Sequence, residues 1–203
     1  RGIIVRYPSK DVVDIIFNET ASYTCGLILR MLFNEVGNIE PWIKKDRRQL
    51  EEKKLLVIGN GNIGGRVASL MNDFLNVKTY DILENNESHL LNYIKEADCI
   101  TLHIPSNKKN SSFFDKEKLM LMKNNSILVN TARADIVNED ALYDEIVKGR
   151  IKAAFDVFWE EPYNGKLKKY FPEKFYMSPH IASTCTGFLK GCRKNLDQLI
   201  ESI

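Results

Sequence analysis

Three polar side chains, Arg133, Asp156 and His180, each follow a short apolar run that is typical of a buried strand. In an open parallel sheet the carboxyl ends of the strands meet at one edge, and ligands bind there. A planar guanidinium suits a substrate carboxylate, and an imidazole suits proton transfer near neutral pH. The sequence therefore predicts acid-base chemistry on a small carboxylate-bearing substrate at this edge.

A glycine-rich segment lies upstream of these residues. Gly59, Gly61 and Gly64 form a G-x-G-x-x-G pattern directly after the apolar run 55–58 and before a run with helical spacing. In that context the first glycine allows a tight turn, the second lets a pyrophosphate approach, and the third lets the helix pack on the strand. The helix amino terminus then offers free N–H groups to the phosphates. The pattern predicts a dinucleotide site.

Asp81 ends the second apolar run of the same unit, at about the distance from the glycines that is typical of a ribose-binding carboxylate. A carboxylate there accepts hydrogen bonds from ribose hydroxyls and repels a 2′-phosphate. The next residues are Ile82 and Leu83, with no neighbouring cation, so NAD is favoured over NADP. The alternative is a solvated aspartate at a strand end.

The remaining pattern alternates between short apolar runs and segments of helical spacing. Val12, Ile16, Tyr23, Leu27 and Met31 indicate one long helix over residues 10–34. Further strands are expected at 55–58, 77–80, 99–102, 126–129, 153–155 and 175–177, and further helices at 63–74, 86–95, 115–122, 138–149 and 188–203. Asp115 and Asn138 are the expected N-caps of two of these helices. The charged stretch 44–54 is interpreted as a solvated connection.

Six strands separated by helices predict a doubly wound α/β domain of Rossmann type with a parallel sheet. The chain has 203 residues and a net charge of +2, which removes the electrostatic case for a nucleic-acid partner. No stretch approaches the apolar length of a membrane span, so no membrane partner is expected. The four cysteines form no C-x-x-C pair, which favours buried free thiols in the cytoplasm. None of the three histidines has metal-ligand spacing, so no metal is expected.

Several motifs together resemble one family, the D-isomer-specific 2-hydroxyacid dehydrogenases, which include phosphoglycerate dehydrogenases. Besides the glycine-rich turn and Tyr80-Asp81, they are Asn18-Glu19-Thr20-Ala21, Leu102-His103-Ile104-Pro105, Asn130-Thr131-Ala132-Arg133, Asp156-Val157-Phe158-Trp159-Glu160-Glu161-Pro162 and Pro179-His180-Ile181. The last three of these are the most specific. The resemblance implies NAD-dependent hydride transfer between a 2-keto acid and a D-2-hydroxy acid.

The resemblance also implies roles for individual residues. Arg133 resembles the arginine that orients the substrate carboxylate, and His180 resembles the acid/base that exchanges a proton with the substrate oxygen. Glu161, directly before Pro162, resembles the carboxylate that hydrogen-bonds this histidine, with Glu160 as its competitor. The pairing of histidine with glutamate argues against the formate dehydrogenases of the superfamily.

The cofactor contacts follow in the same way. Asn62 and Ile63 correspond to residues beneath the pyrophosphate, and Asp156 with the Thr131–Ala132 backbone corresponds to the groups that hold the nicotinamide carboxamide. Pro105, Arg133 and His180 complete the expected cofactor contacts. Without the resemblance, His180 could be a satisfied residue at a strand end, and Arg133 could pair with Asp135 or Glu139.

The resemblance divides the chain into a dinucleotide-binding domain at 8–183 and a return helix at 184–203. The second, substrate domain would be mostly absent, and the strand-like opening residues 2–5 suggest a start inside a longer protein. The chain by itself would then be inactive. A homodimer is expected, with the helix from Val12 to Met31 as the candidate contact surface. The alternative function is a non-catalytic NAD(H)-sensing or partner-binding module.

Overall fold

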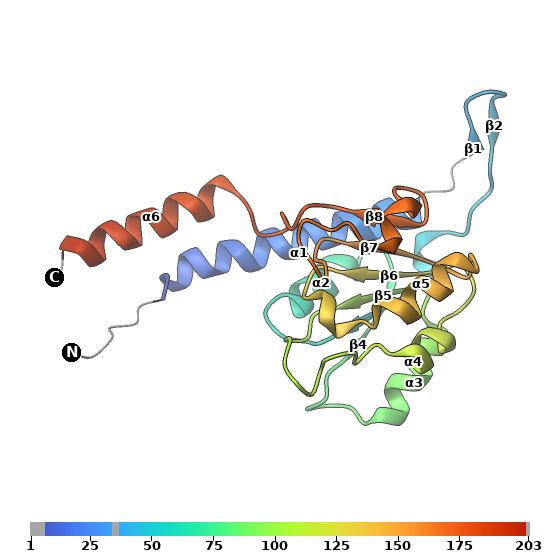
Figure 1. The fold of residues 1–203 in the computed structure, drawn as a ribbon, viewed down its shortest axis with the longest axis horizontal. Helices are drawn as coiled ribbons and strands as arrows, with labels where there is room; N and C mark the ends of the chain where they lie inside the picture. Colours follow the sequence, from blue (N-terminus) through green and yellow to red (C-terminus); the bar gives the residue numbers. More distant parts are fainter. Residues whose placement is uncertain (1–6, 34–36, 202–203) are drawn as a thin grey trace.

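A six-stranded parallel sheet forms the centre of the computed structural model, which describes residues 7–33 and 37–201 (Figure 1). The strand order is β4-β3-β5-β6-β7-β8. Their bounds are β3 (Lys54–Ile58), β4 (Asn76–Tyr80), β5 (Cys99–Leu102), β6 (Ser126–Asn130), β7 (Ile151–Phe155) and β8 (Phe175–Met177). All neighbouring pairs are parallel, which confirms the six predicted strands. The strand order reverses between β3 and β5, so the ligand-binding crevice of such a sheet is expected there.

Helices cover both faces of this sheet, as the doubly wound class requires. α1 (Lys10–Leu32) and α2 (Gly64–Met71) lie on one face, while α3 (Glu87–Glu96), α4 (Lys116–Leu121) and α5 (Glu139–Val147) lie on the other. The alternation within β3 explains the two cores, because Leu55 and Val57 face α1 and α2 whereas Leu56 and Ile58 face the opposite helices. The predicted fold class is confirmed.

Two of the helices begin at the side chains predicted to cap them. The Asp115 carboxylate accepts a hydrogen bond from the Lys118 N–H at 2.9 Å, and the Asn138 side chain accepts one from the Ala141 N–H at 2.9 Å. Each cap satisfies one of the N–H groups that the first helical turn leaves unpaired. The boundaries of α4 and α5 therefore follow from local sequence.

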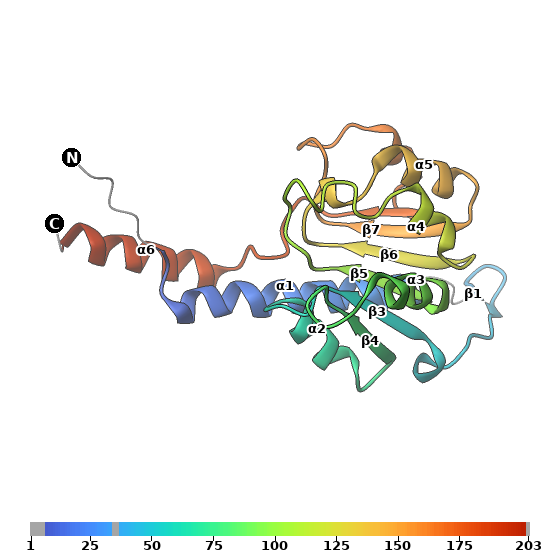
Figure 2. The ribbon, with the colours of Figure 1, turned by 90° about the horizontal axis from the view of Figure 1, so that it is seen from below.

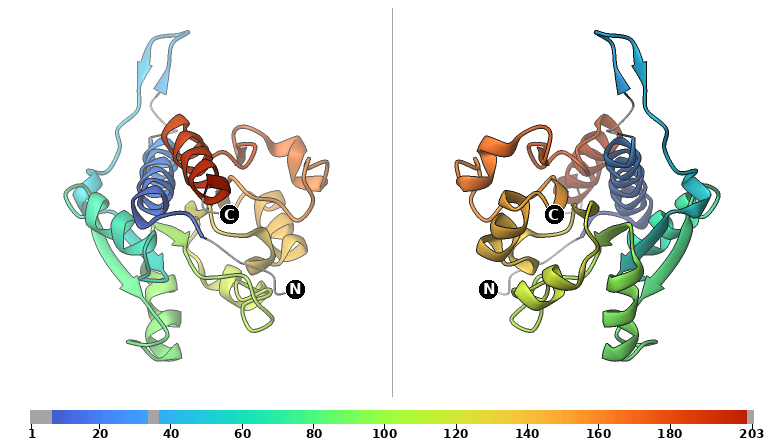
Figure 3. Two further views of the ribbon diagram at one scale, coloured as in Figure 1. Left: turned by 90° about the vertical axis from the view of Figure 1, so that its left-hand side faces the viewer. Right: turned by 90° about the vertical axis from the view of Figure 1, so that its right-hand side faces the viewer.

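The sequence pattern does not predict the projecting hairpin that follows α1. β1 (Gly37–Asn38) and β2 (Ile43–Lys44) pair antiparallel, and Ile39 and Trp42 are each 77% exposed (Figure 3). Strands of two residues carry too little alternation to be recognised in a sequence. An isolated two-stranded hairpin has only marginal stability in water.

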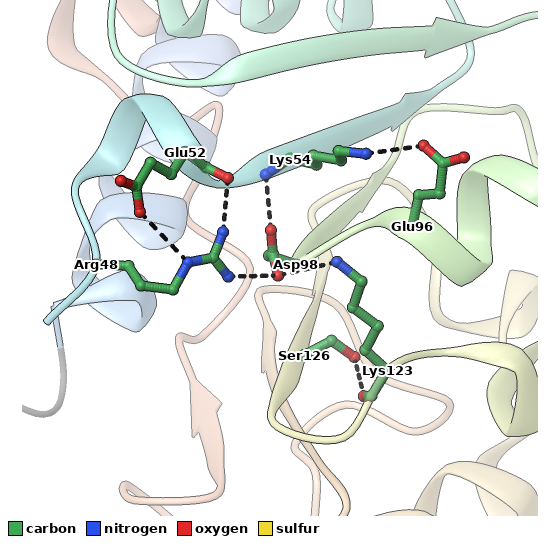
Figure 4. A network of polar contacts seen from close by, with 7 residues as sticks. All are labelled: Arg48, Glu52, Lys54, Glu96, Asp98, Lys123 and Ser126. Carbon is green, nitrogen blue, oxygen red and sulfur yellow. Dashed lines mark hydrogen bonds and ion pairs between the residues drawn. The ribbon is translucent and has the colours of Figure 1, made fainter.

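The connection from this hairpin back to β3 is exposed, as predicted, but its end is fixed by an ion network at the amino edge of the sheet (Figure 4). Asp98 accepts hydrogen bonds from the Lys54 N–H at 2.8 Å, from Lys123 at 3.2 Å and from Arg48 at 3.4 Å. Burial opposes ionisation of Asp98, yet these donors hold its pKa below the usual range. A short 3₁₀ helix (Leu50–Glu52) precedes β3. Two other 3₁₀ helices span Ala134–Ile136 and Lys166–Tyr170.

The last helix, α6 (Thr186–Glu201), lies beside the amino-terminal half of α1 and projects with it beyond the sheet (Figure 2). The side-chain Oδ1 of Asn195 accepts hydrogen bonds from the N–H and hydroxyl of Ser9 at 2.9 and 3.0 Å. Gly191 allows close packing, because a Cβ there would lie 2.7 Å from Val12. The predicted strand at 2–5 and the end of the predicted last helix, at 202–203, lie outside the described residues.

Two expectations about buried surface need correction. Judged by length and composition alone, α1 could cross a membrane, although no such segment was expected from the sequence. Nine of its residues are nevertheless buried, and it packs on α2, β6 and β7 as the core helix of a folded domain does. Of the cysteines, which are all free, Cys25 and Cys99 are buried, whereas Cys185 and Cys192 are only partly buried. α6 lies too far outside the body for full burial of its side chains.

The position of His103 predicts a pH dependence of stability. Desolvation lowers the pKa of its imidazole to about 4, below the ordinary value of about 6.5. The unfolded chain therefore binds a proton between these two values and the folded chain does not, so stability falls as the pH decreases from 6.5 to 4. We expect His103→Gln to remove about 2 kcal/mol of the stability loss between pH 7 and pH 5.

Urea unfolding at the two pH values measures this difference. His89→Gln is the matched control, because His89 is exposed on α3 and stacks on Tyr93. An unchanged pH dependence in the His103 variant would contradict the assignment.

Candidate active site

A cavity of about 570 Å³ opens at the carboxyl edge of the sheet. It lies where the strand order reverses and is bounded by α1, the glycine-rich turn and the loops after β5, β6, β7 and β8. Eight of the predicted site residues line it: Asn62, Ile63, Pro105, Thr131, Ala132, Arg133, Asp156 and His180. The structure thus brings together residues from five separate segments of the chain.

The glycine-rich turn has the geometry that its pattern predicts. Gly59 has φ +97°, and a Cβ there would lie 2.5 Å from the His103 carbonyl oxygen. A Cβ on Gly64 would lie 1.8 Å from the Gly59 carbonyl oxygen, so helix and strand meet without room for a side chain. Gly61 differs, because a Cβ there would meet no other atom within 4 Å and would face open space. The first and third glycines serve packing, and the second leaves room for a ligand.

The start of α2 supplies the donors for that ligand. The backbone N–H groups of Asn62 and Ile63 precede the first helical bond and find no acceptor among residues 7–33 and 37–201. Aligned peptide dipoles add partial positive charge at the same point. The open space in front of Gly61, together with these unpaired N–H groups, fits the pyrophosphate of a dinucleotide.

Asp81 lies beside this turn, immediately after β4. Its carboxylate accepts hydrogen bonds from the N–H of Asn60 at 3.0 Å and of Leu83 at 3.0 Å. These bonds fix a negative charge next to the turn, which suits ribose hydroxyls and disfavours a 2′-phosphate. Asp81 is therefore an ordered carboxylate rather than only a solvated strand end.

The loop that carries Arg133 is held by a buried amide. The Asn130 side chain accepts a hydrogen bond from the Ala132 N–H at 3.0 Å and donates one to the Arg133 carbonyl at 2.9 Å. The Thr131 hydroxyl meets that of Thr24 on α1 at 2.7 Å. Among the described residues the Arg133 side chain has no ion pair with Asp135 or Glu139, and one of its Nη atoms donates to the Ala132 carbonyl. Its charge is thus available at the cavity.

His180 and Glu161 form the expected pair. The imidazole Nδ1 lies 3.0 Å from Glu161 Oε1 and 2.9 Å from Oε2, and the Phe158 N–H donates to Oε1 at 3.1 Å. The hydrogen bond from His180 is the main reason that the pKa of Glu161 lies below its ordinary value, and the charge of Arg133 contributes. Glu161 therefore stays ionised at neutral pH. Glu161, and not Glu160, contacts the histidine.

Asp156 belongs to the cavity wall and is fully buried. Its oxygens accept hydrogen bonds from the Ser178 hydroxyl at 2.6 Å and from the N–H groups of Ile181 at 3.0 Å and Ala182 at 2.8 Å. These bonds join it to the turn that carries His180. Its contact with a nicotinamide carboxamide stays a prediction.

Sequence reasoning missed part of the cavity wall. Ile16, Phe17 and Thr20 of α1 line it, although the helical spacing assigns Ile16 only to an apolar face. Periodicity identifies a helix but not which of its turns crosses the mouth of a cavity, since that depends on the packing of α1 against the sheet. Ala182 and Ser183 also line the wall because they follow His180 in the same turn. No cluster of three potential metal ligands occurs in the described ranges.

Fold and site together define a class: a Rossmann-type dinucleotide-binding domain that presents a histidine–carboxylate pair and an arginine at its ligand edge. Residues 36–182 match the family model described as D-isomer specific 2-hydroxyacid dehydrogenase, NAD binding domain. The chain belongs to this family and contains its NAD-binding domain.

Individual relatives agree with this assignment. The chain is 34% identical over 179 residues to D-3-phosphoglycerate dehydrogenase of Methanocaldococcus jannaschii, covering 79% of this chain and 33% of that one. It is 30% identical to glyoxylate reductase of Thermofilum pendens, covering 90% and 60%. D-lactate dehydrogenase from Aquifex aeolicus, solved with NAD and lactic acid, superposes with a TM-score of 0.78 at 26% identity, covering 92% and 66%. The chain thus spans between a third and two thirds of the length of these relatives.

The glycine geometry predicts opposite effects of two substitutions. Gly64→Ala places a Cβ against the backbone of Gly59, so we expect it to destabilise the fold by roughly 3 kcal/mol or more, as overpacking against rigid backbone does. Gly61→Ala meets no protein atom, so its melting temperature should stay near that of the wild type while NADH affinity decreases. Energy transfer from tryptophan to NADH, with calorimetry for stability, measures both.

The same titration with NADPH provides the control for Asp81. We expect weaker binding of NADPH than of NADH, because the fixed carboxylate would lie against the extra phosphate. If Gly61→Ala binds NADH as the wild type does, the turn does not hold the pyrophosphate.

Proposed function

We propose that the chain is the cofactor-binding part of an NAD(H)-dependent enzyme that interconverts a 2-keto acid and a D-2-hydroxy acid. One observation carries this proposal: His180, whose Nδ1 pairs with Glu161, lines the same cavity as Arg133 and the residues that lead into α2. An acid/base, an anion-binding group and a dinucleotide cradle are the three parts that such a reaction needs. The family membership supports the same reaction class.

The histidine pair determines how the proton moves. Because Glu161 accepts from Nδ1, the neutral imidazole keeps its proton on Nδ1 and presents Nε2 as a base. When the ring is protonated, Nε2–H can donate to the oxygen of a keto acid, and the Glu161 carboxylate stabilises the positive charge. The pair therefore serves reduction as an acid and oxidation as a base.

Arg133 orients the substrate. Its guanidinium can bind the carboxylate of a 2-keto acid through two parallel hydrogen bonds, which fixes the adjacent carbonyl relative to His180. The bound dinucleotide would supply or accept the hydride at C2 of the substrate. The Asn130 side chain binds both the Ala132 N–H and the Arg133 carbonyl, so the backbone that carries the arginine is held in place.

Removal of the acid/base separates chemistry from cofactor binding. In the full-length protein we expect His180→Ala to lower turnover about 10²- to 10⁴-fold, the usual contribution of a general acid or base. NADH affinity should change little, because the pyrophosphate cradle lies in a different segment. Steady-state kinetics with small 2-keto acids and a separate NADH titration measure the two effects.

His89→Ala is the control for this experiment, since His89 lies on the exposed surface of α3. Unchanged turnover in the His180 variant would contradict the catalytic assignment. A wild-type protein that binds NADH but reduces none of the 2-keto acids would instead favour a non-catalytic NAD(H)-sensing or partner-binding module.

We also propose that the protein is a cytoplasmic homodimer. The free cysteines support a reducing compartment. Val12, Leu27 and Met31 of the expected contact helix are buried within the chain itself, whereas Trp42 on the hairpin is exposed. A second copy that covers the hairpin would supply the support that two short strands lack.

Light scattering and fluorescence test the dimer. We expect a dimer mass, and a blue-shifted Trp42 emission because the indole would leave water. Trp42→Ser together with Ile39→Ser should give a monomer with an unchanged far-UV spectrum. Trp159, whose indole N–H donates to the Val137 carbonyl at 2.9 Å, remains as the internal reference for folding. A monomeric wild type would refute the proposal.

A further inference from the structure

The backbone of His180 lies in an unusual conformation. Its φ is 54°, in the left-handed region that residues with a side chain rarely adopt. Such a residue persists only when its surroundings hold it there. The His180 N–H donates to the Ser178 carbonyl at 2.9 Å, which closes a tight turn directly before the ring that contacts Glu161.

The buried carboxylate of Asp156 holds the other side of this turn. The two successive N–H groups after His180, those of Ile181 and Ala182, point to different oxygens of Asp156, at 3.0 and 2.8 Å. Consecutive N–H groups next to a left-handed residue form a concave anion site. Asp156 therefore fixes the backbone conformation of His180 through its immediate successors.

Ser178 in turn fixes Asp156. A carboxylate only accepts hydrogen bonds, so the serine hydroxyl is the donor in their 2.6 Å contact, a short charge-assisted bond. Ser178 is buried, and it lies two residues before His180. Tyr23 of α1 lies near both groups, and burial raises its pKa, so this tyrosine remains neutral and adds no competing charge.

We propose that Ser178 is a positioning residue for the proton-transfer step: through Asp156 it fixes the turn that aims His180 at Glu161. The proposal rests on the proposed function for the acid/base role of His180, but its structural part concerns only this chain. Loss of the hydroxyl removes one of the three donors to Asp156 and leaves Oδ1 with the Ile181 N–H alone. The carboxylate can then shift with the backbone of Ile181 and Ala182, and the imidazole of His180 moves away from its alignment with Glu161.

The chain has only three histidines, which makes a spectroscopic test direct. With ¹³C-labelled imidazole rings at a single neutral pH, the His180 signal is assigned by its loss in His180→Gln. We expect Ser178→Ala to move this signal toward its position in Glu161→Gln, because both changes break the same pair. The signals of His89 on α3 and His103 after β5 should stay in place.

Two further variants keep the test decisive. Ser178→Thr keeps a hydroxyl that can donate to Asp156. It should return the His180 signal to the wild-type position. If the alanine variant does not fold, Ser178→Cys keeps the volume with a weak donor and replaces it.

Ser126→Ala is the matched control. Ser126 is also buried and donates to the Lys123 carbonyl at 2.7 Å, but it lies at the opposite edge of the sheet (Figure 4). It should lower the melting temperature without moving the His180 signal. An unmoved His180 signal in a folded Ser178→Ala protein would overturn the proposal, as would a shift of equal size in all three histidines.

Kinetics of the full-length protein supply the functional readout. We expect Ser178→Ala to lower kcat by about 10- to 100-fold, the effect of a small misalignment at a reacting group, with KM and NADH affinity almost unchanged. Ser178→Thr should recover the rate. A wild-type protein without turnover would refute the proposed function, whereas the imidazole signals would still decide whether Ser178 positions His180.

Discussion

The contact between Gly64 and the Gly59 carbonyl group sets the geometry on which the site depends. A side chain at Gly64 would overlap that carbonyl, so α2 begins as close to the end of β3 as backbone atoms allow. His103 packs against the same turn from β5, and the N–H groups at the start of α2 consequently face the crevice between these two strands. A dinucleotide can approach this turn closely because Gly61 presents no side chain toward the open space in front of it.

The rest of the carboxyl edge follows a second rule, in which polar side chains at strand ends bind the backbone of the loops. Asp81 after β4, Asn130 at the end of β6 and Asp156 after β7 each accept hydrogen bonds from backbone N–H groups nearby. Loops at this edge would otherwise leave such N–H groups to water. These hydrogen bonds therefore help to fix loop conformations that regular secondary structure does not.

Much of this could be predicted from sequence, because the signals were local. Apolar runs gave the strands, Asp115 and Asn138 marked helix starts, and the resemblance to the D-2-hydroxyacid dehydrogenases gave the pairing of His180 with Glu161. The hairpin at β1 and β2 and the α1 residues in the cavity wall could not be predicted, because they depend on tertiary packing. The hydrogen-bond partners of Asp156 also could not be predicted, for the same reason. The residue type shows that the Asp156 carboxylate can accept hydrogen bonds. Only the fold shows that the donors are the N–H groups of Ile181 and Ala182.

Solvent exposure determines how strongly the charged groups at the cavity interact. The side chains of His180 and Glu161 are 42% and 41% exposed, so water weakens their attraction in the chain as it stands. Covering the cavity would exclude water and strengthen every charge interaction within it. α1 provides a direct mechanical link for such a cover, since Ile16 and Phe17 line the cavity while Val12 packs against α6. Leu189, Leu196 and Ile200 remain exposed on α6. Any structure that packs on this helix pair therefore contacts the same helix that forms one wall of the cavity.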